Sequence, residues 1–136
     1  MSYLLDTNVC IALINETSSK VRAHFLRASR RKATLATSTI VVHELWYGVA
    51  KSELVARNAR ALAAFLSRNV SVLDYSAQDA QAAGEIRVEL ERQGQRIGEY
   101  DTLIAGQTYS RNLILVTANT SEFARVRGLI VEDWSE

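Results

Sequence analysis

The chain has 136 residues, of which 48% are hydrophobic and 23% are charged, and these proportions exclude a disordered chain. They predict one globular domain over residues 1–136. No apolar run approaches the ~18 residues that span a bilayer, the N-terminus lacks a signal-peptide pattern, and the single cysteine, Cys10, excludes an internal disulfide. We therefore expect a cytoplasmic protein without a membrane partner.

The net charge of +1 is unevenly distributed along the chain. Residues 17–72 carry ten Lys and Arg side chains against two acidic ones, Glu44 and Glu53, whereas residues 73–136 are acidic on balance. This asymmetry predicts a surface that meets a polyanion such as a nucleic acid, and solvated helix faces with scattered charge are the alternative.

The first half of the chain alternates between short apolar runs and amphipathic stretches. Residues 3–5 predict a buried strand that runs directly into a helix, since Asp6 and Thr7 both favour the N-cap position. Apolar residues at helical spacing predict a helix over 18–30. The other elements predicted here are a strand over 34–37, a helix from Ile40 to about Lys51 capped by Ser38 or Thr39, and a helix over 53–68.

The second half continues the same alternation. A strand over 70–73 precedes a helix that extends to about Gln93, and Ser76 with Asp79 resembles a capping box at its start. The elements predicted after it are a helix over 100–110, a strand over 113–116, a short helix over 121–125 and a strand over 129–131. Strands that alternate with helices predict an α/β fold with a mainly parallel sheet covered on both faces.

Acidic side chains recur where strands end and helices begin. Asp6 follows the first predicted strand, Asp101 opens a helix, and Asn119 and Glu122 follow the strand that ends at Val116. Ligands of open α/β sheets bind beyond the carboxyl ends of the strands, so these groups are candidates for one cleft. Taken singly, each also fits a helix cap or a turn.

Glu44 differs from these acids because it lies inside an apolar helical stretch. A carboxylate there must face water or find a cation, since an unpaired buried charge is costly. Several acids in one cleft would repel each other, and a divalent cation removes the conflict. Ligands that are all oxygen suit Mg²⁺ or Mn²⁺.

Four segments and the tail of the chain resemble the PIN-domain ribonucleases and, more narrowly, the VapC-type toxins of bacterial toxin–antitoxin pairs. The resemblance covers essentially the whole chain in the right order. The segments that carry it are Leu5–Ile11 (LDTNVCI), Val42–Gly48 (VHELWYG), Ile97–Ala105 (IGEYDTLIA), Leu115–Phe123 (LVTANTSEF) and Gly128–Trp134 (GLIVEDW).

The resemblance implies a PIN-like α/β/α sandwich and Mg²⁺- or Mn²⁺-dependent endonucleolytic cleavage of RNA. Matched position by position, Asp6, Glu44 and Asp101 correspond to the family's three core metal-site acids, and Glu44 either binds metal or accepts a proton from the attacking water. The fourth acidic position matches Asn119 and, three residues later, Glu122. Thr7 and Thr117 match hydroxyl positions that support the acids.

The resemblance also implies partners: a homodimer, and a cognate VapB-type antitoxin whose C-terminal segment lies in the active-site groove. Among RNA substrates it favours tRNA, initiator tRNA first, with ribosomal RNA and mRNA as the other classes. The sequence departs from the family where Glu99 and Arg127 replace common prolines. Candidate RNA contacts are Arg87, Arg92 and Arg96, and a second basic run comprises Arg27, Arg30, Arg31 and Lys32.

Two other functions compete with a nuclease. A haloacid-type phosphohydrolase or phosphoryl receiver is disfavoured, since Asn8 stands where the hydrolase needs a second Asp and no lysine follows Lys51. A catalytically weak PIN-like RNA- or protein-binding module stays open because of Asn119. His43 does not share a helix face with Glu44 and is expected to be structural or exposed.

The aromatic pair Trp46–Tyr47 allows two interpretations. It suits core packing, or an exposed surface that stacks on bases or meets a protein partner.

Overall fold

A computed structural model describes residues 1–136 and contains a five-stranded, entirely parallel sheet in the order β3-β2-β1-β4-β5. The fold class predicted from the alternation of elements is thus confirmed. The strands are β1 (Ser2–Leu5), β2 (Thr34–Ser38), β3 (Ser71–Leu73), β4 (Ile114–Val116) and β5 (Ile130–Glu132).

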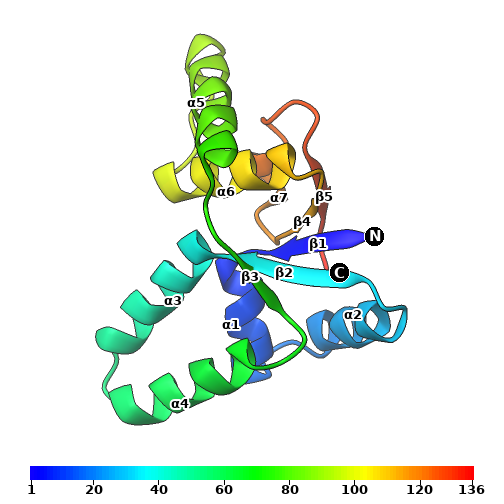
Figure 1. The fold of residues 1–136 in the computed structure, drawn as a ribbon, viewed down its shortest axis with the longest axis vertical. Coiled ribbons are helices and arrows are strands. Elements are labelled where there is room, and N and C mark those ends of the chain that lie inside the picture. The colour runs from blue at the N-terminus through cyan, green and yellow to red at the C-terminus, as the bar shows by residue number, and fades with distance from the viewer.

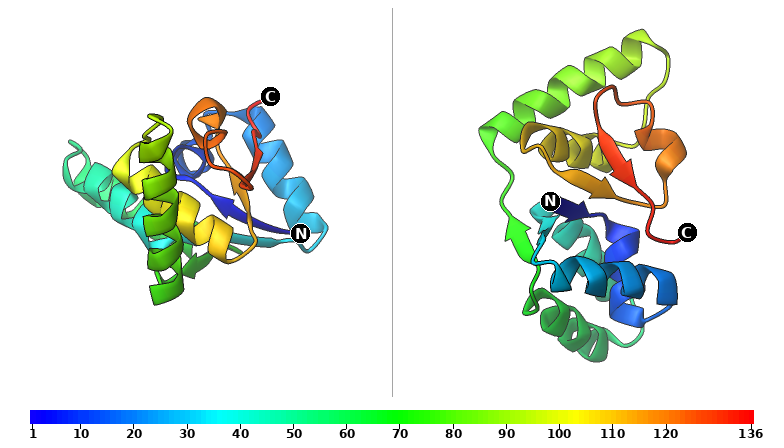
Figure 2. Two further views of the ribbon diagram at one scale, coloured as in Figure 1. Left: turned by 90° about the horizontal axis from the view of Figure 1, so that it is seen from above. Right: turned by 90° about the vertical axis from the view of Figure 1, so that its right-hand side faces the viewer.

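Helices cover both faces of the sheet, four on one side and three on the other (Figures 1 and 2). The first group is α1 (Thr7–Asn15), α2 (Ser19–Arg30), α3 (Thr39–Ala50) and α4 (Val55–Leu66). The second group is α5 (Ala77–Arg92), α6 (Glu99–Ser110) and α7 (Thr120–Phe123). The chain contains no helix long and apolar enough to cross a membrane.

The order of the strands explains why the helices divide between two faces. From β1 the chain steps outward to β2 and β3, and it then crosses back to β4 and β5 on the other side of β1. Crossovers between parallel strands are almost always right-handed, so a reversal of direction moves the connecting helices to the opposite face. The reversal leaves a crevice outside the carboxyl ends of β1 and β4, where ligands of such sheets bind.

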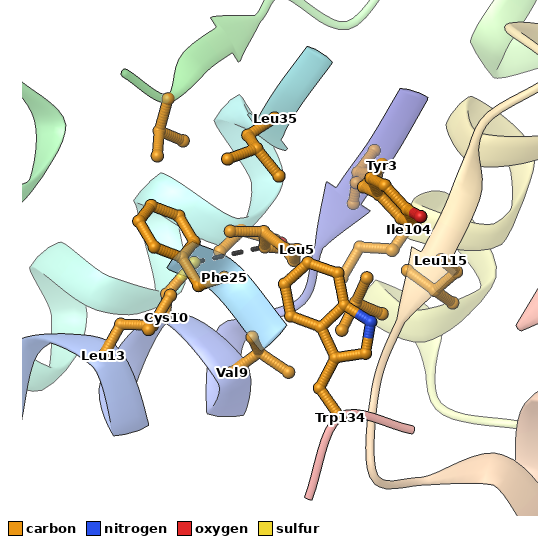
Figure 3. Packing of buried hydrophobic residues seen from close by; sticks show 14 of the residues in the cluster. Tyr3, Leu5, Val9, Cys10, Leu13, Phe25, Leu35, Ile104, Leu115 and Trp134 are labelled. Carbon is orange, nitrogen blue, oxygen red and sulfur yellow. Dashed lines mark hydrogen bonds between the residues drawn. The ribbon is translucent and has the colours of Figure 1, made fainter. Parts of the chain in front are cut away.

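In the core, the C-terminal tail packs against the start of the chain (Figure 3). The Trp134 ring is buried, meets the Tyr3 ring edge to face at 5.2 Å between centroids, and stacks on His24 at 5.7 Å. Cys10 is fully buried beside Leu5, and burial raises the pKa of its thiol to about 12. His24 and Cys10 therefore have structural roles in this core.

Element boundaries lie close to those predicted, with one larger difference at α4. This helix begins at Val55 rather than residue 53, and its N-cap, Leu54, offers no side-chain hydrogen bond. Ser38 caps α3, and Ser76 and Asp79 form the predicted capping box on α5.

Core packing is the wrong interpretation of two aromatic residues. The side chains of Trp46 and Tyr47 are 42% and 61% exposed on α3.

Candidate active site at the carboxyl edge of the sheet

Asp6 stands where β1 runs into α1, at the crevice between β1 and β4. Its backbone N–H donates to the Val116 carbonyl at 3.1 Å, and its Oδ1 accepts from the Val9 N–H at 3.0 Å. It is therefore the N-cap of α1, and it is buried. Burial raises the pKa of Asp6, hydrogen bonds from Thr117 and two backbone N–H groups oppose this, and the Glu44 charge raises the pKa further.

Glu44 reaches the same edge from α3. The Thr7 hydroxyl donates to Glu44 Oε1 at 2.8 Å, and Thr7 is the first residue of α1. The hydrogen bond holds the half-buried Glu44 carboxylate beside Thr7, which directly follows Asp6. Glu44 thus acts electrostatically on Asp6 from a different helix.

Asp101 enters the crevice from the opposite face of the sheet, in the first turn of α6. Burial raises the pKa of Asp101 to about 6, and the charges of Glu122, Glu44 and Asp6 raise it in the same direction. These acids come from separate elements. Asp101 is therefore near enough to acids of three other elements for their charges to act on it.

Asn119 and Glu122 have different roles at this edge. The Asn119 N–H donates to Thr117 Oγ1 at 3.0 Å, and its Nδ2 donates to Glu122 Oε2 at 2.6 Å. The charge of Glu122 also contributes to the raised pKa of Asp101, after burial. Glu122 therefore lies beside Asp101, and Asn119 orients it.

The donor chemistry of the site fits a hard divalent cation. Each of these acidic side chains offers oxygen, and the pKa of Asp101 rises through burial first and then through repulsion by neighbouring carboxylates. No three acidic, imidazole or thiol groups stand close enough to form a ready-made cage. The residues that fit such an ion are therefore acids held by separate hydrogen bonds, from Thr7 and Asn119, rather than a pre-closed cluster.

The candidate RNA-binding arginines lie outside the cluster of acids, and two of them border a neighbouring cavity. Arg87 and Arg96 line a cavity of about 360 Å³ between α5 and α6, together with Glu99, and both side chains lie within 4 Å of Glu91. Arg92 pairs instead with Glu89 and is largely exposed.

The basic run at residues 27–32 lies at the opposite end of the strands from the acids. It ends α2 just before β2 begins at Thr34, so it stands at the amino ends of the strands, away from the acids. The structure does not bring this run to the site.

Sequence reasoning missed one pair beside the site. His43 Nε2 lies 3.3 Å from the Tyr100 hydroxyl, and the two rings meet edge to face. Each residue directly precedes a site acid, Glu44 or Asp101. That adjacency was the only available signal.

Comparison with known proteins assigns the family. The PIN domain profile matches residues 3–129. The chain is 44% identical to the tRNA(fMet)-specific endonuclease VapC of Shigella flexneri over 99% of both chains, and 42% identical to the protein of the same name from Salmonella typhimurium over 98% of both.

Solved structures agree with this assignment. The fold is similar to VapBC2 from Rickettsia felis bound to a promoter DNA fragment, with a TM-score of 0.92, 40% identity and coverage of 98% of this chain and 99% of the other. It is also similar to DNA-bound VapBC from Salmonella typhimurium, with a TM-score of 0.89, 40% identity and 98% coverage of both chains. With the full-length identity, the shared fold and the acids at the carboxyl edge, the chain belongs to the PIN domain family and, within it, to the VapC ribonucleases.

Proposed function

We propose that this ribonuclease is a Mg²⁺- or Mn²⁺-dependent endonuclease that acts as the toxin of a VapBC-type pair in the cytoplasm and cleaves tRNA, with initiator tRNA as the first candidate. The proposal is supported by the electrostatic effect of Glu122, Glu44 and Asp6, acids from three other elements, on Asp101. The substrate class is supported by the Shigella and Salmonella relatives, which are named for activity on tRNA(fMet).

Each acid has a role in the proposed chemistry. Asp6 and Asp101 would hold the ion, Glu122 would complete the set of oxygen ligands, and Glu44 would either bind the ion or act as the base. When bound, the ion lowers the pKa of a water molecule and offsets negative charge on the phosphodiester. Glu44 is suited to accept the proton of the attacking water, because the Thr7 hydroxyl occupies one carboxylate oxygen and leaves the other free. No side-chain nucleophile is required.

An apolar groove supports the proposed antitoxin partner. A cavity of about 270 Å³ lies between α1, α3 and α4, and both Ile11 and Glu44 line it. Ile11 is 39% exposed, and Ile14, Leu45 and Val49 add further apolar lining. An apolar peptide in this groove would end against the acid site, and the Rickettsia and Salmonella structures are of VapBC complexes. A homodimer belongs to the same proposal through the resemblance to this family.

The first test is cleavage of purified tRNA and of total RNA by antitoxin-free protein with Mg²⁺ or Mn²⁺. We expect cuts at one site in initiator tRNA that disappear with EDTA, in Asp6→Ala and in Asp101→Asn. Glu85→Gln is the matched control, because it removes an exposed acid of α5. Cutting that survives EDTA and both Asp variants would contradict the metal-dependent mechanism. RNA binding without cleavage would instead favour a binding module.

A further inference from the structure

Two exposed rings from helices on opposite faces of the sheet contact each other, next in sequence to Glu44 and Asp101. Tyr100 is 48% exposed at the start of α6, and His43 is exposed near the start of α3. Their ring centroids lie 5.5 Å apart at an interplanar angle of 62°, and His43 Nε2 is 3.3 Å from the Tyr100 hydroxyl. α3 and α6 contact each other, and the two rings are part of that contact. Each ring is therefore held in place by the other.

The position of the pair relates it to the proposed reaction. His43 directly precedes Glu44, and Tyr100 directly precedes Asp101, and the charge of Glu44 acts on Asp101. The ring contact therefore lies beside these two acids, although each ring leaves its helix on a different side from the acid that follows it. A phosphodiester seated at these acids carries a nucleobase on each flanking nucleotide, and the rings are a neighbouring surface for one of those bases.

The chemistry of the pair suits a nucleobase better than a phosphate or a protein. Two edge-to-face rings leave ring faces uncovered for stacking, and neither side chain brings the fixed charge of an Arg or Lys. An aromatic side chain offers ~150–250 Å², so the pair falls well short of the ~800 Å² that each partner of a stable protein complex buries. One or two stacked bases match this area.

We propose that the Tyr100–His43 pair is a stacking platform for a nucleobase of single-stranded RNA beside the scissile phosphate. The inference rests on the proposed nuclease function for its placement, and it concerns base contact rather than phosphate chemistry. Tyr100 supplies the main stacking face, and His43 orients the Tyr100 ring through the edge-to-face ring contact. The exposed face of α3 continues from His43 to Trp46, one helical turn further along.

The test compares two fluorescent 12-mers of equal charge in EDTA, so that no cleavage occurs. One is oligoadenylate, and the other is an abasic ribose-phosphate chain that lacks all bases. Stacking is worth enough per base that Tyr100→Leu should weaken the Kd for oligoadenylate about 10- to 100-fold. The Kd for the abasic chain should stay unchanged, because its phosphates do not use the ring. Tyr100→Phe keeps the ring and should stay within about threefold of the wild type.

Tyr109→Leu is the matched control, because Tyr109 is 51% exposed on the same helix but lies at its far end. It should bind both probes as the wild type does. His43→Leu is a second variant that leaves Tyr100 in place, and it should weaken oligoadenylate binding by a smaller factor than Tyr100→Leu.

Three results would overturn the proposal. They are an unchanged Kd of Tyr100→Leu for oligoadenylate, an equal loss on both probes, and unchanged RNA binding combined with a changed oligomeric mass or a weaker antitoxin complex. The last result would assign the rings to a protein interface. Because binding is measured without metal, a failure of this proposal is distinguishable from a failure of the nuclease function, which the cleavage of tRNA tests separately.

Discussion

The hydroxyl of Thr7 lies 2.8 Å from Oε1 of Glu44 and donates a hydrogen bond to it, which joins α1 to α3 at the carboxyl edge of the sheet. Thr7 directly follows Asp6, so two consecutive residues place one acid and hold another. The bond restricts a carboxylate that is 37 residues away in the chain. Thr7 is thus a positioning residue for Glu44.

Replacing Thr7 with Val keeps the shape of the side chain and removes the donor. A hydrogen bond to a charged group is worth about 1.5–3 kcal/mol, so we expect the kcat for RNA cleavage to fall about 10- to 100-fold while KM changes little. Thr7→Ser retains the donor and should keep most of the activity. Single-turnover cleavage separates these effects. Wild-type kcat in Thr7→Val would contradict the positioning role.

The fourth acidic position is tested by variants at Glu122 and Asn119. Because Asn119 Nδ2 contacts Glu122 and Glu122 acts on Asp101, Glu122→Gln should weaken Mn²⁺ binding and cleavage more than Asn119→Ala does. Asn119→Ala should weaken Mn²⁺ binding about tenfold, as loss of an orienting partner does. The double variant should resemble Glu122→Gln alone. Calorimetric titration of Mn²⁺ gives the comparison, and additive losses would show that Asn119 acts independently.

The stability of the metal-free protein should depend on Asp101. Burial, with the charges of Glu122, Glu44 and Asp6, raises the pKa of Asp101 to about 6, above the ~3.9 of an unfolded Asp. The folded state therefore holds this proton more tightly than the unfolded state, and the stability that the proton contributes is lost as pH rises from about 4 through about 6.

Asp101→Asn removes the repelled charge while it abolishes cleavage. In EDTA at pH 7 the variant should be more stable than the wild type by about 1 kcal/mol, a figure reduced because water screens a half-exposed carboxyl. The difference should vanish below about pH 4. Thermal unfolding at several pH values measures it, with Glu85→Gln as the control. A less stable Asp101→Asn protein at pH 7 would refute the prediction.

A second acid, Asp79, is stabilised by a partner rather than repelled. It is 1% exposed, and it accepts from Arg111 Nη2 at 2.9 Å, Ser110 Oγ at 2.5 Å and the Ser76 N–H at 2.9 Å. Burial raises the pKa of Asp79, but the hydrogen bonds from Arg111, Ser110 and Ser76 outweigh it, and the net pKa is below the usual value. The network ties the start of α5 to the end of α6.

Arg111→Met leaves this buried carboxylate without its counter-charge. The free energy of unfolding should fall by about 3–5 kcal/mol, because the unpaired charge is still desolvated. Arg92→Met is the matched control, since the Arg92–Glu89 pair is exposed and should contribute less than about 1 kcal/mol.

The stabilising contribution of Asp79 is present above the unfolded pKa of ~3.9 and is lost as pH falls toward the lower folded pKa. The loss of unfolding free energy caused by Arg111→Met should therefore be smaller at acidic pH. Urea unfolding at pH 7 and pH 3 tests both points. If Arg111→Met lowers the free energy of unfolding at pH 7 as little as Arg92→Met does, Arg111 is not the charge that stabilises Asp79.

Local sequence patterns were enough to predict the order of the elements and where the acids fall along it. Helical periodicity, the Ser76–Asp79 capping box and the placement of Asp6 after an apolar run depend on near neighbours, so they are visible without the fold. For the same reason, the alternation of strands and helices predicted the parallel sheet, and the acids at the ends of strands predicted one shared cleft.

Features that depend on residues distant in the chain could not be predicted from local patterns. The strand order β3-β2-β1-β4-β5 creates the crevice, and it arises from pairing between segments that local patterns do not connect. The Trp46 side chain is exposed at the surface, although the residues of its helix are mostly apolar. His43 and Tyr100 are 57 residues apart in the chain, and only the fold brings them into contact. Likewise, Asn119 and Glu122 share one helix face in sequence, and only the approach of α6 places Glu122 against Asp101, because long-range packing sets which side chains meet.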